Sequence, residues 1–141
     1  MICVCLGEGS PSQEMKDAFL LLADEAVEAG VNTFYVGAES ETEAMMLEIL
    51  HKIKRAHSKM EITVVLTEDP GENWPDDLAV CPKGVEHLSG AEAIEARNEW
   101  LMFMADFFIG FMNTKNTASR KLIETAKKRK IEFFNLSQAV A

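Results

Sequence analysis

Short apolar runs alternate with longer amphipathic segments along most of this chain of 141 residues. The runs are rich in β-branched and aromatic residues, as strands are. The segments between them carry apolar residues at helical spacing, such as Met15, Phe19 and Leu22. Strands that alternate with helices form a parallel sheet covered on both faces. Five strands are predicted, at Met1–Leu6, Val31–Val36, Glu61–Leu66, Asp106–Met112 and Ile131–Leu136.

Three of the predicted helices begin at a serine that is suited to be an N-cap. Ser10, Ser40 and Ser89 each precede a Gln or Glu by three residues, which is the spacing of a capping box. Gly30 supplies a C-terminal stop for the first of these helices. A fourth helix is expected near Thr117–Lys130, where apolar residues again recur at helical spacing.

The segment from Glu68 to Leu88 gathers prolines and glycines and is expected to be a long connection, with room for a short extended piece at Leu78–Cys81. We therefore predict one α/β domain over residues 1–141. It is a single-domain three-layer sandwich with a five-stranded parallel sheet in the order 3-2-1-4-5. The order reverses between strands one and four, so a ligand crevice is expected where Gly7–Ser10 and Asn113–Ser119 face each other.

The composition excludes several classes of protein. Hydrophobic residues make up 48% of the chain and charged residues 26%, as in globular domains. No apolar run approaches the roughly 20 residues of a membrane span, and no basic leader precedes the first strand, so a cytoplasmic protein with no membrane contact is expected. The net charge of −9 argues against nucleic acid as a partner.

The cysteines and histidines do not form a metal-binding pattern. Cys3 and Cys5 alternate along a strand, which points both thiols to one face and does not match the spacing of a zinc site. The three histidines lack a metal-ligand spacing as well. We expect core thiols, no metal and no cofactor.

Charge is distributed unevenly along the chain. Residues 1–48 contain ten acidic side chains and one basic one, Lys16. Seven of the 14 Lys and Arg residues lie between Lys115 and Lys130. The start of the fourth helix offers free backbone N–H groups and the positive end of the helix dipole, so an anion is expected there.

Two segments resemble the RNxWM and aDxxIxy signature of YpsA-like proteins, which belong to the SLOG superfamily of Rossmann-like nucleotide-binding domains. They are Ala96–Met102 and Ala105–Phe111. The strands around Gly30–Ala38 and Met60–Thr67 are similar to the second and third strands of that family. The resemblance implies a Rossmann-like fold and a nucleotide or nucleotide-sugar ligand, similar to ADP-ribose, with phosphate near the loop after strand four.

The glycine motifs of that family are degenerate in this chain. Thr117-Ala118-Ser119 stands where the family has Gly-Gly and a small residue, although Lys121 keeps the family's lysine. Ala38–Glu43 replaces a glycine-rich turn and adds three carboxylates, which repel an anion. We expect a weakened or altered site. The candidate ligand-binding residues are Gly7, Gly9, Ser10, Gly37, Arg97, Asn98, Asn113, Thr117, Ser119 and Lys121.

Two interpretations of Arg97 remain open. Its planar fork suits a phosphate or carboxylate of a ligand, but it equally suits a structural ion pair with Asp106 or a nearby glutamate. Asp106 begins a strand at the end far from the crevice, which favours a structural role for it. Trp100 is expected to pack in the core rather than stack on a ligand.

Catalysis is expected to be absent. Related phosphoribohydrolases and deoxyribosyltransferases carry a Glu three residues after a Gly-Thr pair, but every register of this chain puts Arg120, Lys121 or Leu122 there. No catalytic residue is therefore assigned. One alternative is an N-glycosidic-bond hydrolase or transferase that uses Glu8 or Glu39, and another is a degenerate domain that mediates protein association.

The segment Trp100–Met104, with Phe107 and Phe108, holds more large apolar groups than one helix face buries. A homo-oligomer surface is one explanation, and cover by the connection Glu68–Leu88 is the other.

Overall fold

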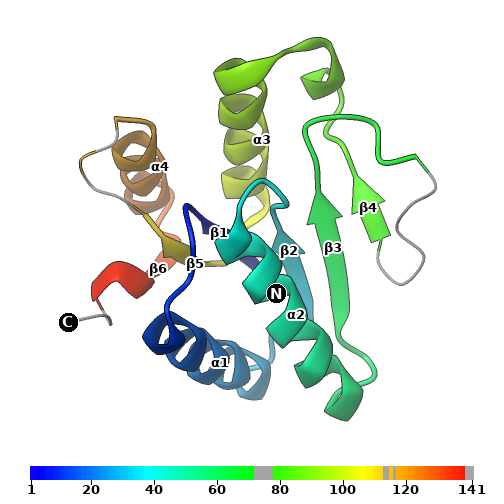
Figure 1. Ribbon diagram of the computed structural model, residues 1–141, viewed down its shortest axis with the longest axis vertical. Coiled ribbons are helices and arrows are strands. Elements are labelled where there is room, and N and C mark those ends of the chain that lie inside the picture. Colours follow the sequence, from blue (N-terminus) through cyan, green and yellow to red (C-terminus); the bar gives the residue numbers. More distant parts are fainter. Residues whose placement is uncertain (72–77, 113–114, 116, 139–141) are drawn as a thin grey trace.

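The computed structural model describes residues 1–71, 78–112, 115 and 117–138. Strands and helices alternate as the sequence predicts (Figure 1). The strands are β1 (Ile2–Gly7), β2 (Thr33–Val36), β3 (Glu61–Val65), β4 (Leu78–Val80), β5 (Phe107–Phe111) and β6 (Glu132–Asn135). The helices are α1 (Gln13–Glu28), α2 (Glu41–Ala56), α3 (Gly90–Met104) and α4 (Thr117–Lys128), with short 3-10 turns η1 (Val85–His87) and η2 (Leu136–Gln138).

The sheet has six strands rather than the predicted five. Their order is β4-β3-β2-β1-β5-β6, and the pairings between the described strands are parallel. The additional strand β4 lies at the edge beside β3, where Leu66 N–H donates to Val80 O at 2.8 Å. It corresponds to the short extended piece expected at Leu78–Cys81, which is not counted among the five predicted strands of the sheet because three residues are too few for a recognisable alternation. The other five strands keep the predicted relative order.

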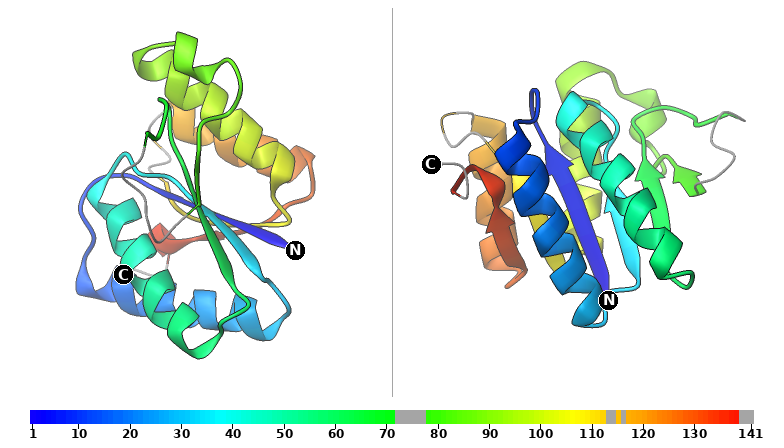
Figure 2. Two further views of the ribbon diagram at one scale, coloured as in Figure 1. Left: turned by 90° about the vertical axis from the view of Figure 1, so that its right-hand side faces the viewer. Right: turned by 60° about the horizontal axis from the view of Figure 1, so that its bottom comes forward.

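Helices cover both faces of the sheet, which makes the three layers visible in Figure 2. Helices α1 and α2 pack on one face, and α3 and α4 pack on the other. Alternate residues of β1 enter opposite cores, because successive side chains of a strand point to opposite faces. Cys3 and Cys5 lie as free, buried thiols against α1 and α2, whereas Val4 and Leu6 face α3 and α4. This arrangement is compatible with a Rossmann-like fold.

The helix starts agree with the sequence prediction at two of the three serines, Ser40 and Ser89, and a side-chain capping bond forms at Ser40. Ser40 caps α2, and its hydroxyl accepts a hydrogen bond from Glu43 N–H at 3.1 Å. The N-cap of α1 is Ser12 rather than Ser10, which instead donates to Glu41 Oε2 at 2.6 Å. Ser89 stands at the N-cap position of α3 but makes no side-chain capping bond.

The apolar end of α3 is largely covered. Trp100 stacks on Tyr35 with ring centroids 5.8 Å apart, so it packs in the core. Leu101 and Met102 are buried, whereas Phe103 is exposed and lies beneath the Arg129 guanidinium, 4.8 Å from its ring centroid. A homo-oligomer surface on this helix stays a prediction. Among the described residues, no helix is long and apolar enough to cross a membrane.

The packing predicts how two leucine substitutions differ. Leu50 of α2 is fully buried in the core, whereas Leu21 of α1 is 61% exposed. Leu50→Ala should lower the free energy of unfolding by about 2–5 kcal/mol, because the transfer of buried methyl groups is lost and a cavity remains. Leu21→Ala removes the same atoms from the surface and should change it by less than about 0.5 kcal/mol. Urea denaturation measures both, and equal losses would contradict the core assignment.

Candidate functional site

A cavity of about 670 Å³ opens at the carboxyl ends of the central strands β1 and β5. Its wall is built from the end of β1, the turn before α2, the end of β5, and helices α3 and α4. Residues that the sequence separates by more than 100 positions therefore meet here, among them Gly7 and Ser119. This is the crevice expected from the reversal of strand order.

Helices α3 and α4 each turn one face toward the cavity. Ala91, Ile94, Glu95 and Asn98 recur at helical spacing along α3, and all of them line the cavity. Helix α4 contributes Ala118, Lys121, Leu122 and Thr125 in the same pattern. The wall is thus mixed: apolar groups alternate with hydroxyl and charged groups.

Arg97 supplies a buried cation to this wall. Its residue is only 2% exposed, and its Nε and Nη2 atoms donate to Asn98 Oδ1 at 3.2 and 2.9 Å. Its Nη1 atom lies 3.6 Å from Glu39 Oε1 and has no hydrogen-bond partner among the residues that the structure describes. Asn98 therefore fixes one edge of the guanidinium and leaves the other edge with an unused donor.

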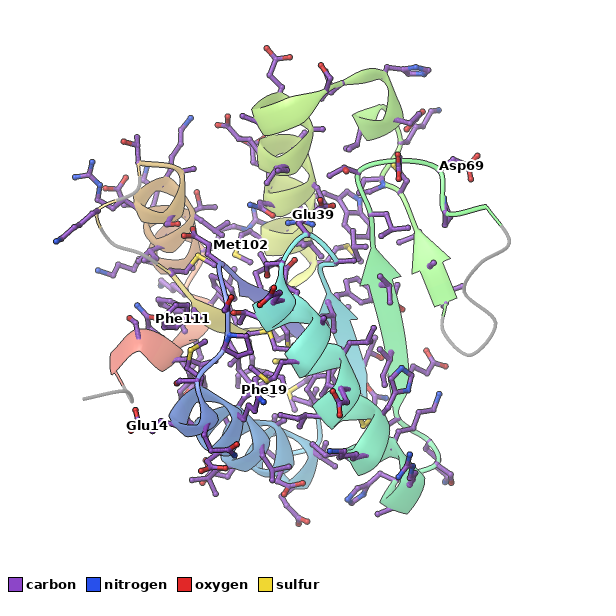
Figure 3. The ribbon with its side chains drawn as sticks, in the orientation of Figure 1. Glu14, Phe19, Glu39, Asp69, Met102 and Phe111 are labelled. Carbon is purple, nitrogen blue, oxygen red and sulfur yellow. The ribbon has the colours of Figure 1, made fainter. Side chains whose placement is uncertain are left out.

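Glu39 lies beside this donor, at ion-pair distance. Figure 3 shows it in the turn between β2 and α2, close to the lower part of α3. The expected alternative partner of Arg97, Asp106, does not contact it. The Asp106 carboxylate accepts from Ile2 N–H at 2.8 Å at the opposite end of the sheet, in the structural role that its position favoured.

The Glu43 side chain, in the first turn of α2, fills the space beside Gly37, where a Cβ atom is absent. Its carboxylate accepts from Gly7 N–H at 3.2 Å and from Glu39 N–H at 2.7 Å. A Cβ atom at Gly37 would come within 2.5 Å of Glu43 Oε2, so only glycine fits beside this carboxylate. Burial raises the pKa of the Glu43 carboxyl above its ordinary 4.5, against the opposing effect of Arg97 and the two amides.

Glu8 supplies a second internal carboxylate at the start of α4. Its Oε1 atom accepts a hydrogen bond from the Ser119 hydroxyl, which is buried in the first turn of that helix. A negative group is favoured here because the dipole of α4 points its positive end toward it. This contact joins the β1 turn to α4 across the crevice.

Acidic groups outnumber basic ones in the cavity. Among the described residues its wall carries the carboxylates of Glu8, Glu39, Glu43, Glu95 and Glu99 against the cations of Arg97 and Lys121. Lys121 is itself paired, with its Nζ 2.7 Å from Glu95 Oε1, and this hydrogen bond raises the pKa of the lysine. Arg97 differs from Lys121 in being buried, and its Nη1 donor has no hydrogen-bond partner among the described residues.

The structure gathers most of the predicted binding residues but not all of them. Ser10 and Gly37 do not line the cavity, because Ser10 turns to Glu41 and Gly37 packs against Glu43. Asn113 lies outside the described residues. The predicted residues that do line the cavity are Gly7, Gly9, Arg97, Asn98, Thr117, Ser119 and Lys121.

Sequence reasoning missed two carboxylates of the wall, Glu95 and Glu99. The sequence does contain a signal for them. Glu95 and Glu99 lie four residues apart on one helix face, and two like charges at this spacing destabilise an isolated helix by a few tenths of a kcal/mol, which suggests cations nearby in the folded protein. Their place between the buried Arg97 and Lys121 offsets that repulsion. In the part of the chain that the structure describes, no cluster of three or more His, Cys, Asp or Glu side chains is arranged to hold a metal ion.

The fold and the site together define a class: a three-layer α/β domain with a parallel sheet and a polar cavity at its switch point. No protein-family model matches this chain, and no curated protein matches it. The resemblance to the SLOG superfamily stays a prediction.

Replacement of Glu43 by Gln tests the internal carboxylate. Gln has one acceptor oxygen for two backbone donors, so the variant should lose about 1–3 kcal/mol of stability. The pKa of Glu43 is raised in the folded state. Its contribution to the free energy of unfolding is therefore largest below pH 4.5, the ordinary pKa, and falls as the pH rises through the folded pKa. The stability difference between wild type and Glu43→Gln should therefore shrink with rising pH.

Urea denaturation between roughly pH 4 and pH 8 measures this difference. Glu48→Gln is the matched control, because Glu48 lies on the exposed side of the same helix and pairs with Lys52 at 3.6 Å. A difference for Glu43→Gln that grows with pH would contradict the assignment.

Proposed function

We propose that this protein binds a nucleotide-like small molecule in the cavity, with an anionic group of the ligand held by Arg97. The single observation that carries the proposal is the Nη1 atom of Arg97, which is buried in a residue that lines the cavity and lacks a hydrogen-bond partner among the described residues. A buried donor without a partner carries a desolvation penalty, which a ligand phosphate or carboxylate would remove.

The position of the cavity supports a ligand. Open parallel sheets bind ligands outside the carboxyl ends of strands at the point where connections leave in opposite directions. Here β1 connects through α1 on one face, whereas its neighbour β5 follows α3 on the other (Figure 2). The volume of about 670 Å³ matches small-molecule sites, and an open cavity favours binding over the alternative of a filled, purely associative domain.

The remaining groups of the wall suit the sugar part of a nucleotide. Carboxylates such as Glu8 and Glu39 accept hydrogen bonds from hydroxyl groups. Ile94, Leu122 and Met112 offer apolar surface to a ribose or a base. The predicted resemblance to nucleotide-binding SLOG domains agrees with this chemistry.

Arg97→Ala tests the proposal. Isothermal titration of the wild-type protein with AMP should give saturable heat, and Arg97→Ala should weaken binding by at least roughly tenfold, because one charge-assisted hydrogen bond contributes about 1.5–3 kcal/mol. Arg97→Lys keeps the charge but loses the fork and should also bind more weakly. Arg55→Ala, an exposed arginine near the end of α2, is the control. Unchanged binding by a folded Arg97→Ala would contradict the proposal.

A second candidate function is hydrolysis of the N-glycosidic bond of a nucleoside monophosphate. It is favoured by the hydrogen bond from the Ser119 hydroxyl, which orients the Glu8 carboxylate inside the cavity. In this reaction Glu8 takes a proton from water, the water oxygen bonds to the anomeric carbon, and the base leaves with the bonding electron pair and takes up the proton from Glu8, which restores the carboxylate.

Chromatographic assay of free base released from AMP tests this candidate. The wild-type protein should release base, and Glu8→Gln should slow release by roughly 100-fold or more, since a general base contributes that much. Glu48→Gln should retain the wild-type rate. Absence of release by the wild-type protein removes this candidate and leaves the binding proposal standing.

A further inference from the structure

We infer that the cavity selects a ligand with one terminal anionic group attached to a hydroxyl-bearing sugar, and that Glu39 excludes ligands with a chain of two or more phosphates. This inference rests on the proposed function, because it names the class of ligand that the Arg97 site accepts. A sugar monophosphate and a nucleoside monophosphate share the required chemistry.

Three donors of the kind that would hold a second phosphate are already used within the described part of the chain. Backbone N–H groups at strand ends and hydroxyls at helix starts are the usual phosphate partners in folds of this type. Here the N–H groups of Gly7 and Glu39 donate to Glu43, and the Ser119 hydroxyl donates to Glu8. The chain's own carboxylates thus occupy both places.

Glu39 is the carboxylate that a ligand anion must meet first. Its Oε1 atom lies 3.6 Å from Arg97 Nη1, within ion-pair distance but too far for a hydrogen bond, and its side chain is 36% exposed. To leave Arg97 to the ligand, this carboxylate has to rotate and give up the hydrogen bond that its Oε1 atom accepts from the Thr67 hydroxyl at 3.3 Å. One terminal anionic group of a ligand would replace the Glu39 carboxylate beside Arg97, so that the positive charge of Arg97 would again face one negative group.

A second phosphate would meet mainly carboxylates. Among the described residues the other cation of the wall is Lys121, which is 66% exposed and already paired with Glu95, and the rest of the wall near Arg97 presents Glu8, Glu39 and Glu43. Like-charge juxtaposition inside a partly buried site is strongly unfavourable. The same carboxylates accept hydrogen bonds from ribose hydroxyls, so they oppose a polyphosphate and favour a sugar.

The test is isothermal titration of the full chain with ribose 5-phosphate, AMP, ADP and ATP at one ionic strength. The wild-type protein should bind AMP at least roughly tenfold more tightly than ADP, with ATP weaker still. Binding of ribose 5-phosphate comparable to that of AMP would assign the affinity to the sugar phosphate, and much weaker binding would assign part of it to the base. Both results support the inference.

Glu39→Gln should reduce the preference for AMP over ADP to within about threefold, chiefly through tighter ADP binding. Glu48→Gln removes the same charge from the exposed face of α2 and should leave the preference unchanged. The wild-type preference is a measurement of its own, so the inference stays testable if the variant does not fold.

The possible results distinguish failure of this inference from failure of the proposed function. Wild-type binding of ADP as tight as that of AMP would overturn this inference while the proposed function stands. An unchanged preference in folded Glu39→Gln would overturn the role of Glu39. Absence of binding by all four compounds would overturn the proposed function, and this inference with it.

Discussion

The carboxylate of Glu43 is the interaction on which the carboxyl end of the sheet depends. It accepts from the N–H groups of Gly7 and Glu39, so one side chain ties the end of β1 and the turn after β2 to the first turn of α2. The glycine at position 37 is explained by this contact, since a Cβ atom there would overlap the carboxylate. The crevice is therefore assembled around an anion that the chain itself supplies.

The hydrogen bonds and ion pairs that the chain makes within the cavity wall determine which ligand groups the cavity can bind. Glu43 and Glu8 satisfy donors that a phosphate would otherwise use, and Lys121 is paired with Glu95. Among the described residues, the buried donor that keeps no hydrogen bond is Nη1 of Arg97, whose guanidinium Asn98 holds from the other side. The cavity thus combines a modest binding capacity for anions with an acidic wall that suits hydroxyl groups.

The sequence predicted what depends on local periodicity and on topology. The alternation of strands and helices, the parallel sheet and the crevice between β1 and β5 are confirmed, as is the cap at Ser40. It predicted the extended piece at Leu78–Cys81 but not that this piece pairs with β3 as a sixth strand, because three residues carry no periodic signal. Nor did it predict the cap of α1, because two serines compete there and Ser10 bonds to Glu41. The partners of Glu43 and Arg97 are long-range contacts, which no spacing rule contains.

The most direct test of the central claim is a crystal structure of the protein with AMP bound. The account predicts phosphate oxygens within hydrogen-bond distance of Arg97 Nη1, with Glu39 turned away and Glu43 still bound to the N–H of Gly7. A phosphate seated on the N–H groups of Gly7 and Glu39, with the Glu43 carboxylate displaced and Arg97 still facing Glu39, would contradict it.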